Sequence, residues 1–318
     1  MTALTGIIRD EIARSGPISF RRFMELALYH PTYGYYLRPD RDPFGRDGDF
    51  FTAEQIQPVF GRLIAARIRG LYREMGEPSD FAVVELGAGR REMQEALAEF
   101  RYIPIDVGSG DLPECFRGVV FSNEFFDALP AHRIVWVDGE PRESLVEWRN
   151  DRFEWAHGAP VAGAVREYVL RYFADDPERL SAEVNLDALE WIERISRRLT
   201  SGYIFTIDYG YTVKEARRFP DGTLMSYRRH TSSADVLAQP GDRDLTAHVC
   251  FTALEDHGMR HGLKTARFET LSRTLLEAGE ADQFAAALAG GDEVSRRLQL
   301  KTLLFGMGET FRTLLQQK

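Results

Sequence analysis

A short apolar run that ends in two glycines could bind a nucleotide-like cofactor. The segment 83–90, VVELGAGR, places Gly87 and Gly89 in the turn that follows the run. Because glycine has no side chain, the backbone there can approach a ligand closely and offer it N–H groups. A dinucleotide fingerprint requires a third glycine at the sixth position of G-x-G-x-x-G, and this chain has Glu92 there. The pattern therefore argues against a nicotinamide or flavin cofactor.

Two acidic residues flank this turn in the expected sheet. Glu85 lies in the strand before the glycines, and Asp106 ends the next apolar run. A carboxylate at the end of the second strand can accept both ribose hydroxyls of an adenosine. Two acids and two glycines in this order suit S-adenosylmethionine. The alternative is that Asp106 only caps the turn before Gly108.

The segment SNEFFDALP provides a second group of polar residues, Asn123, Glu124 and Asp127. It follows another expected strand, and ligands of open α/β sheets bind outside the carboxyl ends of strands. Methyl transfer is an in-line displacement that depends on alignment and on control of charge. Here the carboxylates could hold a guanidinium or accept the proton that it loses. The alternative is that Glu124 and Asp127 cap the following helix.

The elements that must position these residues follow from the hydrophobic pattern. Buried runs predict parallel strands at 81–86, 103–107, 119–123 and 201–210, with a helix over 91–100. Period-two alternation over 132–155 predicts an antiparallel meander inserted into that sheet, and 211–246 is expected to be an irregular insertion. Helical spacing predicts further helices at 5–15, 19–29, 53–75, 162–173, 184–199, 251–257 and within 271–300.

Composition excludes several classes of protein. Forty Lys and Arg against 49 Asp and Glu give a net charge of -9, the wrong sign for bulk nucleic-acid binding. Cys115 and Cys250 are the only cysteines, without the paired spacing of a structural zinc site, so no metal is expected. No apolar stretch approaches about 20 residues, and the first 16 residues contain no apolar run. We therefore expect a cytoplasmic protein that has no membrane partner.

Seven sequence blocks, in order along nearly the whole chain, resemble one known family. They are GPISFRRFMELALYHPTYGYY (16–36), GDFFTAEQIQPVFG (48–61), VELGAGR, SNEFFDALP, IDYGY (207–211), DLTAHV (244–249) and MGETF (307–311). In these blocks the chain resembles the MidA-like proteins, relatives of the mitochondrial complex I assembly methyltransferase in the class I methyltransferase superfamily.

The resemblance implies a fold, a cofactor and a substrate class. The implied α/β fold is a Rossmann-like core with a mostly parallel twisted sheet over 79–318, a helical cap over 1–78, and insertions near 132–156 and 211–246. The cofactor would be S-adenosylmethionine. Protein arginine is the substrate class attributed to the mitochondrial members, so a protein substrate is expected; the sequence does not indicate the oligomeric state.

Site residues carry over block by block. The cofactor would contact the glycine turn, the GDFFT loop and neighbouring polar groups, namely Gly48, Asp49, Phe50, Thr52, Glu85, Gly87, Gly89, Asp106 and Asn123. The expected catalytic residues are Asn123, Glu124, Asp127 and His248, with Asp208 and Tyr209 supplied by IDYG. The alternative for His248 is a buried histidine that is satisfied by structural hydrogen bonds.

The chain also departs from the family pattern. Arg91 replaces the last glycine of the usual ELGPGRG loop, the stretch from Gly89 to Asp106 is short, and Cys250 stands where an acidic residue is expected. The helix after the second strand is reduced to GSGDLPECF. Two alternatives to a protein methyltransferase therefore stay open: a noncatalytic assembly module, and a small-molecule methyltransferase on the same fold.

Overall fold

The computed structural model describes residues 2–38, 58–176, 178–228 and 231–318, which form two compact units. The first unit comprises Met1–Phe50, Phe126–Glu190 and Tyr211–Ala253. The second comprises Phe51–Phe125, Trp191–Gly210 and Leu254–Lys318. The first unit thus gathers the N-terminal segment together with both expected insertions. Neither unit has a segment that begins or ends near residue 78, where the sequence predicted a domain boundary.

The second unit is built on a mixed sheet whose strand order is β14-β15-β9-β4-β2-β3. The parallel strands are β2 (Phe81–Leu86), β3 (Arg101–Ile105), β4 (Phe116–Asn123) and β9 (Leu199–Tyr211). Two antiparallel strands, β15 (Phe311–Gln317) and β14 (Lys264–Thr270), complete this order beside β9. The expected α/β fold with its parallel strands is confirmed, whereas the sequence did not predict the antiparallel pair.

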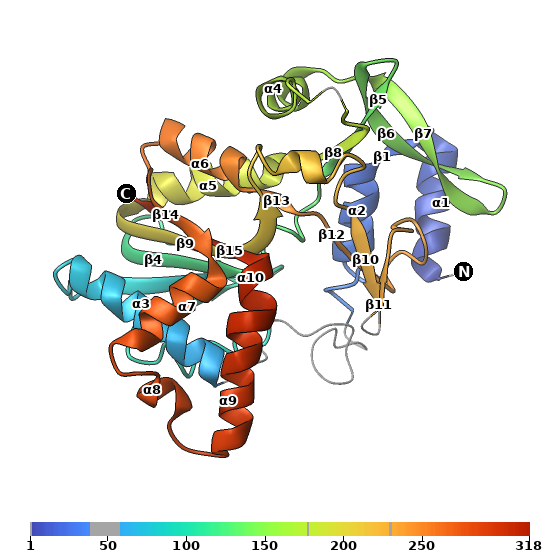
Figure 1. Cartoon of the computed structure of the whole chain (residues 1–318). Helices are drawn as coiled ribbons and strands as arrows, with labels where there is room; N and C mark the ends of the chain where they lie inside the picture. The colour runs from blue at the N-terminus through green and yellow to red at the C-terminus, as the bar shows by residue number, and fades with distance from the viewer. Residues whose placement is uncertain (1, 39–57, 177, 229–230) are drawn as a thin grey trace. The chain divides into compact units, whose positions relative to one another are not determined.

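Helices cover both faces of this sheet, with α3 and α7 below it and α5 and α6 above it in the view of Figure 1. Their bounds are Val59–Glu74 for α3, Leu186–Arg198 for α5, Phe251–Arg260 for α6 and Leu271–Glu280 for α7. Below the sheet, Ile68 of α3 and Leu275 of α7 are completely buried in one hydrophobic core with Phe121 and Phe205 of the strands. Short helical segments follow α7: α8 (Ala285–Leu288), α9 (Glu293–Thr302), a π-helical turn (Leu303–Met307) and α10 (Gly308–Thr310).

The connection between β2 and β3 contains no α-helix, so the predicted helix over 91–100 is wrong. Successive turns occupy it instead, with Gln94 N donating to Arg91 O at 3.0 Å and Leu97 N to Met93 O at 3.0 Å. Both Met93 and Leu97 are completely buried in the core. Because turns can bury two apolar side chains spaced four residues apart as well as a helix can, the sequence pattern was ambiguous here.

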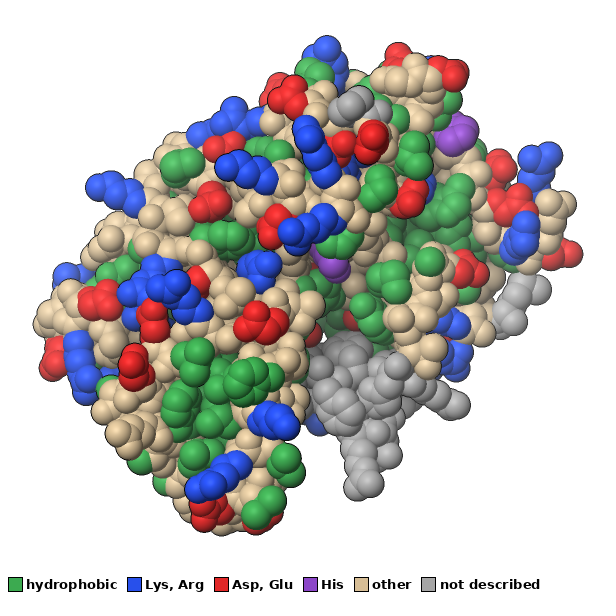
Figure 2. Space-filling view, in the orientation of Figure 1, with side chains coloured by type: hydrophobic (Ala, Val, Ile, Leu, Met, Phe, Trp, Pro, Cys, Tyr) green, Lys and Arg blue, Asp and Glu red, His purple; other side chains and the backbone are tan. Residues whose placement is uncertain are grey.

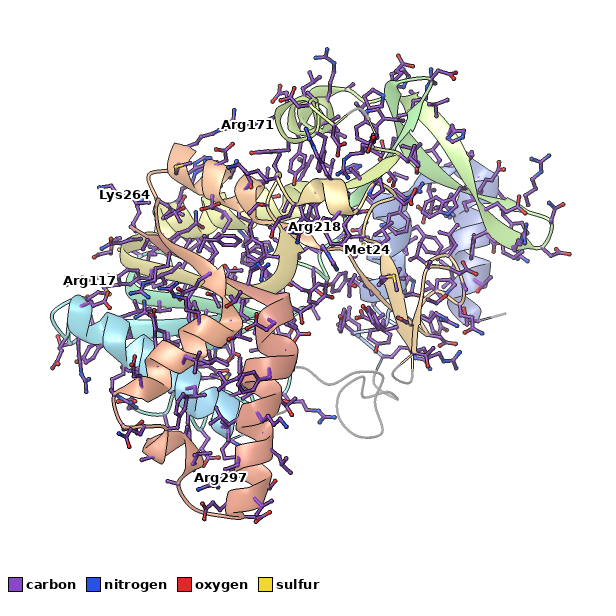
Figure 3. The ribbon with its side chains drawn as sticks, viewed as in Figure 1. Met24, Arg117, Arg171, Arg218, Lys264 and Arg297 are labelled. Atoms are coloured by element: carbon purple, nitrogen blue, oxygen red, sulfur yellow. The ribbon has the colours of Figure 1, made fainter. Side chains whose placement is uncertain are left out.

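The first unit begins with α1 (Ala3–Ser15) and α2 (Phe20–Tyr29), as the sequence predicts. The hydroxyl of Ser19 caps α2 by accepting a hydrogen bond from Arg22 N at 3.2 Å. Met24 of α2, labelled in Figure 3, is completely buried in this unit. A further helix, α4 (Gly163–Tyr172), also matches its prediction.

The predicted meander exists, but it is not inserted into the parallel sheet. Its strands are β5 (His132–Val137), β6 (Glu140–Arg149) and β7 (Arg152–Pro160). They form a separate antiparallel sheet with β1 (Ile18–Ser19) and β8 (Ser181–Val184). Alternating apolar residues specify which face of a strand is buried but not which sheet the strand joins, and this explains the error.

Residues 211–246 are more regular than the sequence indicates. A three-stranded antiparallel sheet is formed by β10 (Met225–Arg228), β11 (Thr231–Ser233) and β12 (Asp244–Thr246). A 3-10 turn (Ala216–Arg218) precedes it, and β13 (Val249–Cys250) follows. These strands are only two to four residues long, too short for a hydrophobic period to be recognised.

The surface carries one apolar feature that composition does not reveal. Figure 2 shows hydrophobic side chains gathered over the region of α9, where Val294, Leu298 and the following Phe305 are 66%, 59% and 75% exposed. Within the described ranges, no helix has both the length and the apolar character needed to cross a bilayer.

Candidate cofactor and substrate site

The glycine turn after β2 has the backbone that glycine permits. Gly87 and Gly89 have φ values of +70° and +46°, in the left-handed region that disfavours side chains. Between them, Ala88 N donates to Ile105 O at 3.1 Å, which holds the turn against the end of β3. A Cβ built at Gly87 would lie 3.1 Å from Cδ2 of Phe125. The turn therefore exposes backbone at the carboxyl end of β2, as close approach to a ligand requires.

Glu85, one residue before the end of β2, is buried, with 1% of its surface exposed. The hydroxyl of Tyr102 on β3 donates a hydrogen bond to its Oε2 atom. A buried carboxylate is costly without such partners. Sequence analysis missed Tyr102, although the β2–β3 register, which pairs Val83 with Tyr102 and Glu85 with Pro104, places it beside the glutamate's strand.

Asp106 directly follows β3 and closes a tight turn. Its Oδ1 atom accepts a hydrogen bond from Val107 N at 2.7 Å, and its backbone exchanges two hydrogen bonds of 2.9 Å with Ser109. The capping role that the sequence left open is therefore present. Among the described residues the Oδ2 atom has no hydrogen-bond partner, so capping leaves it able to accept a ribose hydroxyl.

Arg91, which stands where the family pattern has a glycine, adopts a left-handed backbone conformation that glycine accepts readily. Its φ is +62°, and its backbone N donates to Ala88 O at 2.6 Å. The side chain is exposed to solvent, so it does not fill the glycine turn. Beside it lies an open hollow of about 770 Å³, whose wall includes Arg91, Glu95, Tyr102 and Pro104 along the edge strand β3.

The end of β4 holds a carboxylate in a strained conformation. Glu124 has a φ of +51°, and its backbone N donates to Ile207 O of β9 at 3.0 Å. The side-chain amide of Asn123, which is 5% exposed, donates to Glu124 Oε1 at 3.1 Å. A non-glycine residue with positive φ persists only where its surroundings enforce it, and such residues cluster at functional sites. Asn123 and β9 thus fix the direction of this carboxylate.

A second acid lies near the end of β9. Asp208 is completely buried, and its Oδ1 atom accepts a hydrogen bond from Tyr209 N at 2.9 Å. The ring of Tyr209 packs edge-on against Phe311, with 5.5 Å between the centroids. Because the parallel register pairs Asn123 with Ile207, Asp208 and Glu124 follow neighbouring positions of the two strands.

The predicted residues of the second unit therefore share one edge of the sheet. Parallel strands have their carboxyl ends on the same side, so the groups at the ends of β2, β3, β4 and β9 lie along it. This row consists of Glu85, Gly87, Gly89, Asp106, Asn123, Glu124, Asp208 and Tyr209.

Asp127 belongs to the first unit, in a buried cluster that sequence analysis did not identify. Asp127 is 3% exposed, and its backbone O accepts a hydrogen bond from Ala247 N at 3.0 Å. The hydroxyl of Tyr36 donates to Asp244 Oδ1 at 2.8 Å. Burial, Asp244, Tyr29 and Asp127 together raise the pKa of Tyr36 well above its usual range. Tyr36 ends one of the family-like blocks and Asp244 begins another, and this position in the sequence could have identified them as site residues.

His248 lies in a hydrogen-bonded chain of the first unit. Its backbone N donates to Thr223 Oγ1 at 3.0 Å, and that hydroxyl donates to Glu183 Oε2 at 2.8 Å. Burial lowers the pKa of His248 to about 4 and raises the pKa of Glu183. The imidazole is therefore neutral at pH 7 and a weak base, better suited to hydrogen bonding than to proton abstraction.

Four predicted cofactor residues, Gly48, Asp49, Phe50 and Thr52, lie outside the described residues. Their contribution to the site stays a prediction.

A parallel sheet whose strands end in a glycine turn and a row of carboxylates is the architecture of S-adenosylmethionine-dependent methyltransferases. A family described as "Putative S-adenosyl-L-methionine-dependent methyltransferase" matches residues 92–269, more than half of the chain. The chain belongs to this family, and its cofactor is S-adenosylmethionine. The residues fit that cofactor, because Gly87 and Gly89 form a turn without side chains at the carboxyl end of β2, and the acid Asp106 directly follows the neighbouring strand β3.

The names of curated relatives agree with the family resemblance found in the seven sequence blocks. A Drosophila melanogaster protein named protein arginine methyltransferase NDUFAF7 homolog, mitochondrial, is 28% identical over 302 residues, covering 77% of this chain and 67% of the relative. The Homo sapiens protein arginine methyltransferase NDUFAF7, mitochondrial, is 28% identical over 310 residues, covering 77% and 66%. The chain thus spans about two thirds of these relatives' length. The expectation of a cytoplasmic protein is contradicted, because these relatives are named as mitochondrial.

Solved structures agree with the fold. A COG1565 superfamily protein from Burkholderia thailandensis, bound to S-adenosyl-homocysteine, has a TM-score of 0.87 and 28% identity, covering 99% of this chain and 92% of that one. A native crystal structure from the same organism and superfamily has a TM-score of 0.81 and 27% identity, covering 99% and 91%. The Rossmann-like class I methyltransferase fold is thereby confirmed.

Proposed function

We propose that this chain transfers the methyl group of S-adenosylmethionine to an arginine side chain of a protein. The observation that carries the proposal is Glu124, a carboxylate held in a strained conformation at the end of β4 and oriented by Asn123. The relatives named as protein arginine methyltransferases support the substrate class. When bound, the cofactor supplies an electrophilic methyl group on a sulfonium.

Glu124 would bind the acceptor guanidinium and control its charge. A guanidinium is protonated at all ordinary pH values, presents a fork of N–H donors, and pairs with a carboxylate in bidentate fashion. Such pairing turns one nitrogen toward the methyl group. Glu124 would accept the proton that this nitrogen loses on methylation, so the product guanidinium keeps a single positive charge. The neighbouring acid Asp208 adds negative charge to the same edge of the sheet.

The acidic and neutral groups of the first unit have separate proposed roles. Asp127, in its cluster with Tyr36 and Asp244, offers negative charge suited to a cationic acceptor. His248 would serve as a neutral hydrogen-bonding group, because burial lowers its pKa to about 4.

Glu85, Gly87, Gly89, Asp106 and Asn123 form the proposed cofactor-binding set. The glycine turn would contact the cofactor through its backbone, and Asp106 Oδ2, which has no hydrogen-bond partner within the described ranges, would accept from a ribose hydroxyl. Calorimetry with S-adenosylhomocysteine tests this set directly, since a saturable one-to-one isotherm is expected and its absence would contradict the assignment.

Transfer itself is tested with radiolabelled cofactor and arginine-containing peptides, followed by amino-acid analysis of the product. Glu124→Gln should lower kcat by at least about 100-fold, because the neutral amide cannot balance the guanidinium charge. Its affinity for S-adenosylhomocysteine should stay unchanged. Glu280→Gln, at the exposed end of α7, is the matched control and should retain full turnover.

Two results would overturn parts of the proposal. Unchanged turnover of Glu124→Gln would remove Glu124 from the reaction. Label found on lysine, or on a small molecule instead of a peptide, would keep the methyltransferase and refute arginine as the acceptor.

A further inference from the structure

Three ligand-type side chains converge between α5 and α6, which lie side by side in Figure 1. His257 Nε2 is 3.9 Å from Glu193 Oε2, and His261 Nε2 is 4.0 Å from the same oxygen. The two imidazole centroids are 4.6 Å apart. All three candidate ligand atoms lie within 4.8 Å of one another.

The local structure accounts for this convergence. His257 and His261 are four residues apart, so the helical turn at the end of α6 places both rings on one face. His261 N donates to His257 O at 3.3 Å and to Gly258 O at 3.0 Å, which extends the turn past Arg260. Glu193 faces them from the neighbouring helix, α5.

The carboxylate is already oriented toward the rings. Arg197 donates a hydrogen bond to Glu193 Oε1, and this leaves Oε2 facing both histidines. Groups that hold a metal-binding carboxylate by its other oxygen commonly orient metal sites in this way.

The histidines are in a state that can bind a metal. The Nε2 atom of His257 is buried and accepts or donates no hydrogen bond among the described residues. A metal ion at this position would give that buried nitrogen a partner.

We propose that Glu193, His257 and His261 bind a divalent transition-metal ion, for which Zn²⁺ is the expected occupant. Two imidazoles and one carboxylate suit zinc, whereas calcium and magnesium prefer oxygen ligands alone. Tetrahedral Zn²⁺ with bonds near 2.1 Å needs ligand atoms about 3.4 Å apart. The three ligand atoms must therefore move toward one another by about 1 Å. Side-chain rotation allows this movement at a partly exposed site.

Water would complete the coordination. The side chains of Glu193, His257 and His261 are 26%, 18% and 26% exposed, so an ion can enter from solvent. None of the three lies at the carboxyl end of a parallel strand, where the cofactor residues are found. The site therefore has a structural role, which is to tie α5 to α6.

The proposed metal site would also be linked to the C-terminal residue and to the sheet. Lys318 Nζ donates to His261 O at 3.2 Å. Lys264, labelled in Figure 3, begins β14 only three residues after His261. A bound ion would therefore stiffen the region where α6 passes into the antiparallel edge of the sheet.

The test uses the full chain, without a histidine tag and stripped with chelator, titrated calorimetrically with Zn²⁺ alone. One ion per chain is expected, with a dissociation constant in the micromolar range or below. His257→Ala, His261→Ala and Glu193→Gln should each weaken binding by at least about 10-fold. The control His157→Ala, on β7, should bind as the unmodified chain does. Mg²⁺ should give no isotherm.

Equal zinc affinity in the three variants would mean that the ion binds elsewhere and would overturn the proposal. Absence of one-to-one binding in the unmodified chain would do the same. Each variant is also titrated with S-adenosylhomocysteine, because retained binding shows that the second unit is folded. That titration also separates the metal site from the proposed methyl transfer, since either can fail without the other.

Discussion

The ring of Phe125 lies against the backbone of Gly87. Its Cδ2 atom is 3.1 Å from the point where a Cβ on residue 87 would stand, and its Cβ atom is 3.6 Å from that point. This contact joins the turn after β2 to the segment after β4. It leaves the glycine turn no room on that side, so any side chain at residue 87 must displace either the ring or the turn.

The first prediction concerns Gly87→Ala. The added methyl group meets Phe125, and a φ of +70° is strained for alanine, so the turn should move away from its cofactor-binding conformation. We expect affinity for S-adenosylhomocysteine to fall by at least about 10-fold, equivalent to about 1.4 kcal/mol. Isothermal calorimetry measures this directly.

Gly76→Ala is the matched control for that variant. Gly76 has a similar φ of +78°, but nothing lies within 4 Å of its added Cβ. It should lose about 1 kcal/mol of stability through backbone strain and keep its cofactor affinity. If both variants bind S-adenosylhomocysteine normally, the glycine turn has been wrongly placed in the site.

The second prediction concerns Arg91, whose φ of +62° is unfavourable for a side chain. Arg91→Gly should raise the free energy of unfolding by about 1 kcal/mol relative to Arg91→Ala, because only glycine relieves the strain. Both variants remove the same charge. Cofactor affinity should be retained in both, since the Arg91 side chain is exposed. Urea denaturation measures the difference, and equal stability of the two variants would contradict the strain at this position.

Much of the cofactor edge could be predicted from sequence because its signals are local. The run 81–86 is apolar except for Glu85 and became β2 with the same bounds, and the glycines after it have the left-handed backbone that their type indicates. Ser19 preceded a helical period and caps α2. In each case a residue's own conformational preference decides the outcome.

Long-range relationships could not be predicted in the same way. Tyr36 and Asp244 are 208 residues apart and meet only through tertiary folding. The buried strand β15 was not predicted, since its pairing with β9 has no local signature. The four-residue spacing of His257 and His261 was visible, but Glu193, which gives that spacing a chemical meaning, comes from a distant helix.

The third prediction concerns the strain at Glu124. Glu124→Gly should be more stable than Glu124→Ala by about 1 kcal/mol, because both lose the contact with Asn123 and only glycine accepts a φ of +51° without cost. Both variants should lack methyl transfer. If Glu124→Gly is inactive but more stable than Glu124→Ala, the positive φ at this position lowers the stability of the folded chain while it places the carboxylate for the reaction. Thermal unfolding and the peptide assay test the two parts separately, and a Glu124→Gly variant that keeps turnover would refute the catalytic role.

The fourth prediction concerns pH and His248. Burial lowers the pKa of its imidazole from 6.5 to about 4, so the folded chain resists a proton that the unfolded chain accepts. Stability from this group is therefore complete above about pH 6.5 and falls as the pH drops toward 4, by about 2 kcal/mol at pH 5. His248→Gln should lose correspondingly less stability between pH 7 and pH 5, whereas His157→Gln on β7 should follow the unmodified chain. Denaturant unfolding of the three proteins at the two pH values measures the difference, and parallel losses in all three would show that His248 is protonated as readily in the folded chain as in the unfolded one.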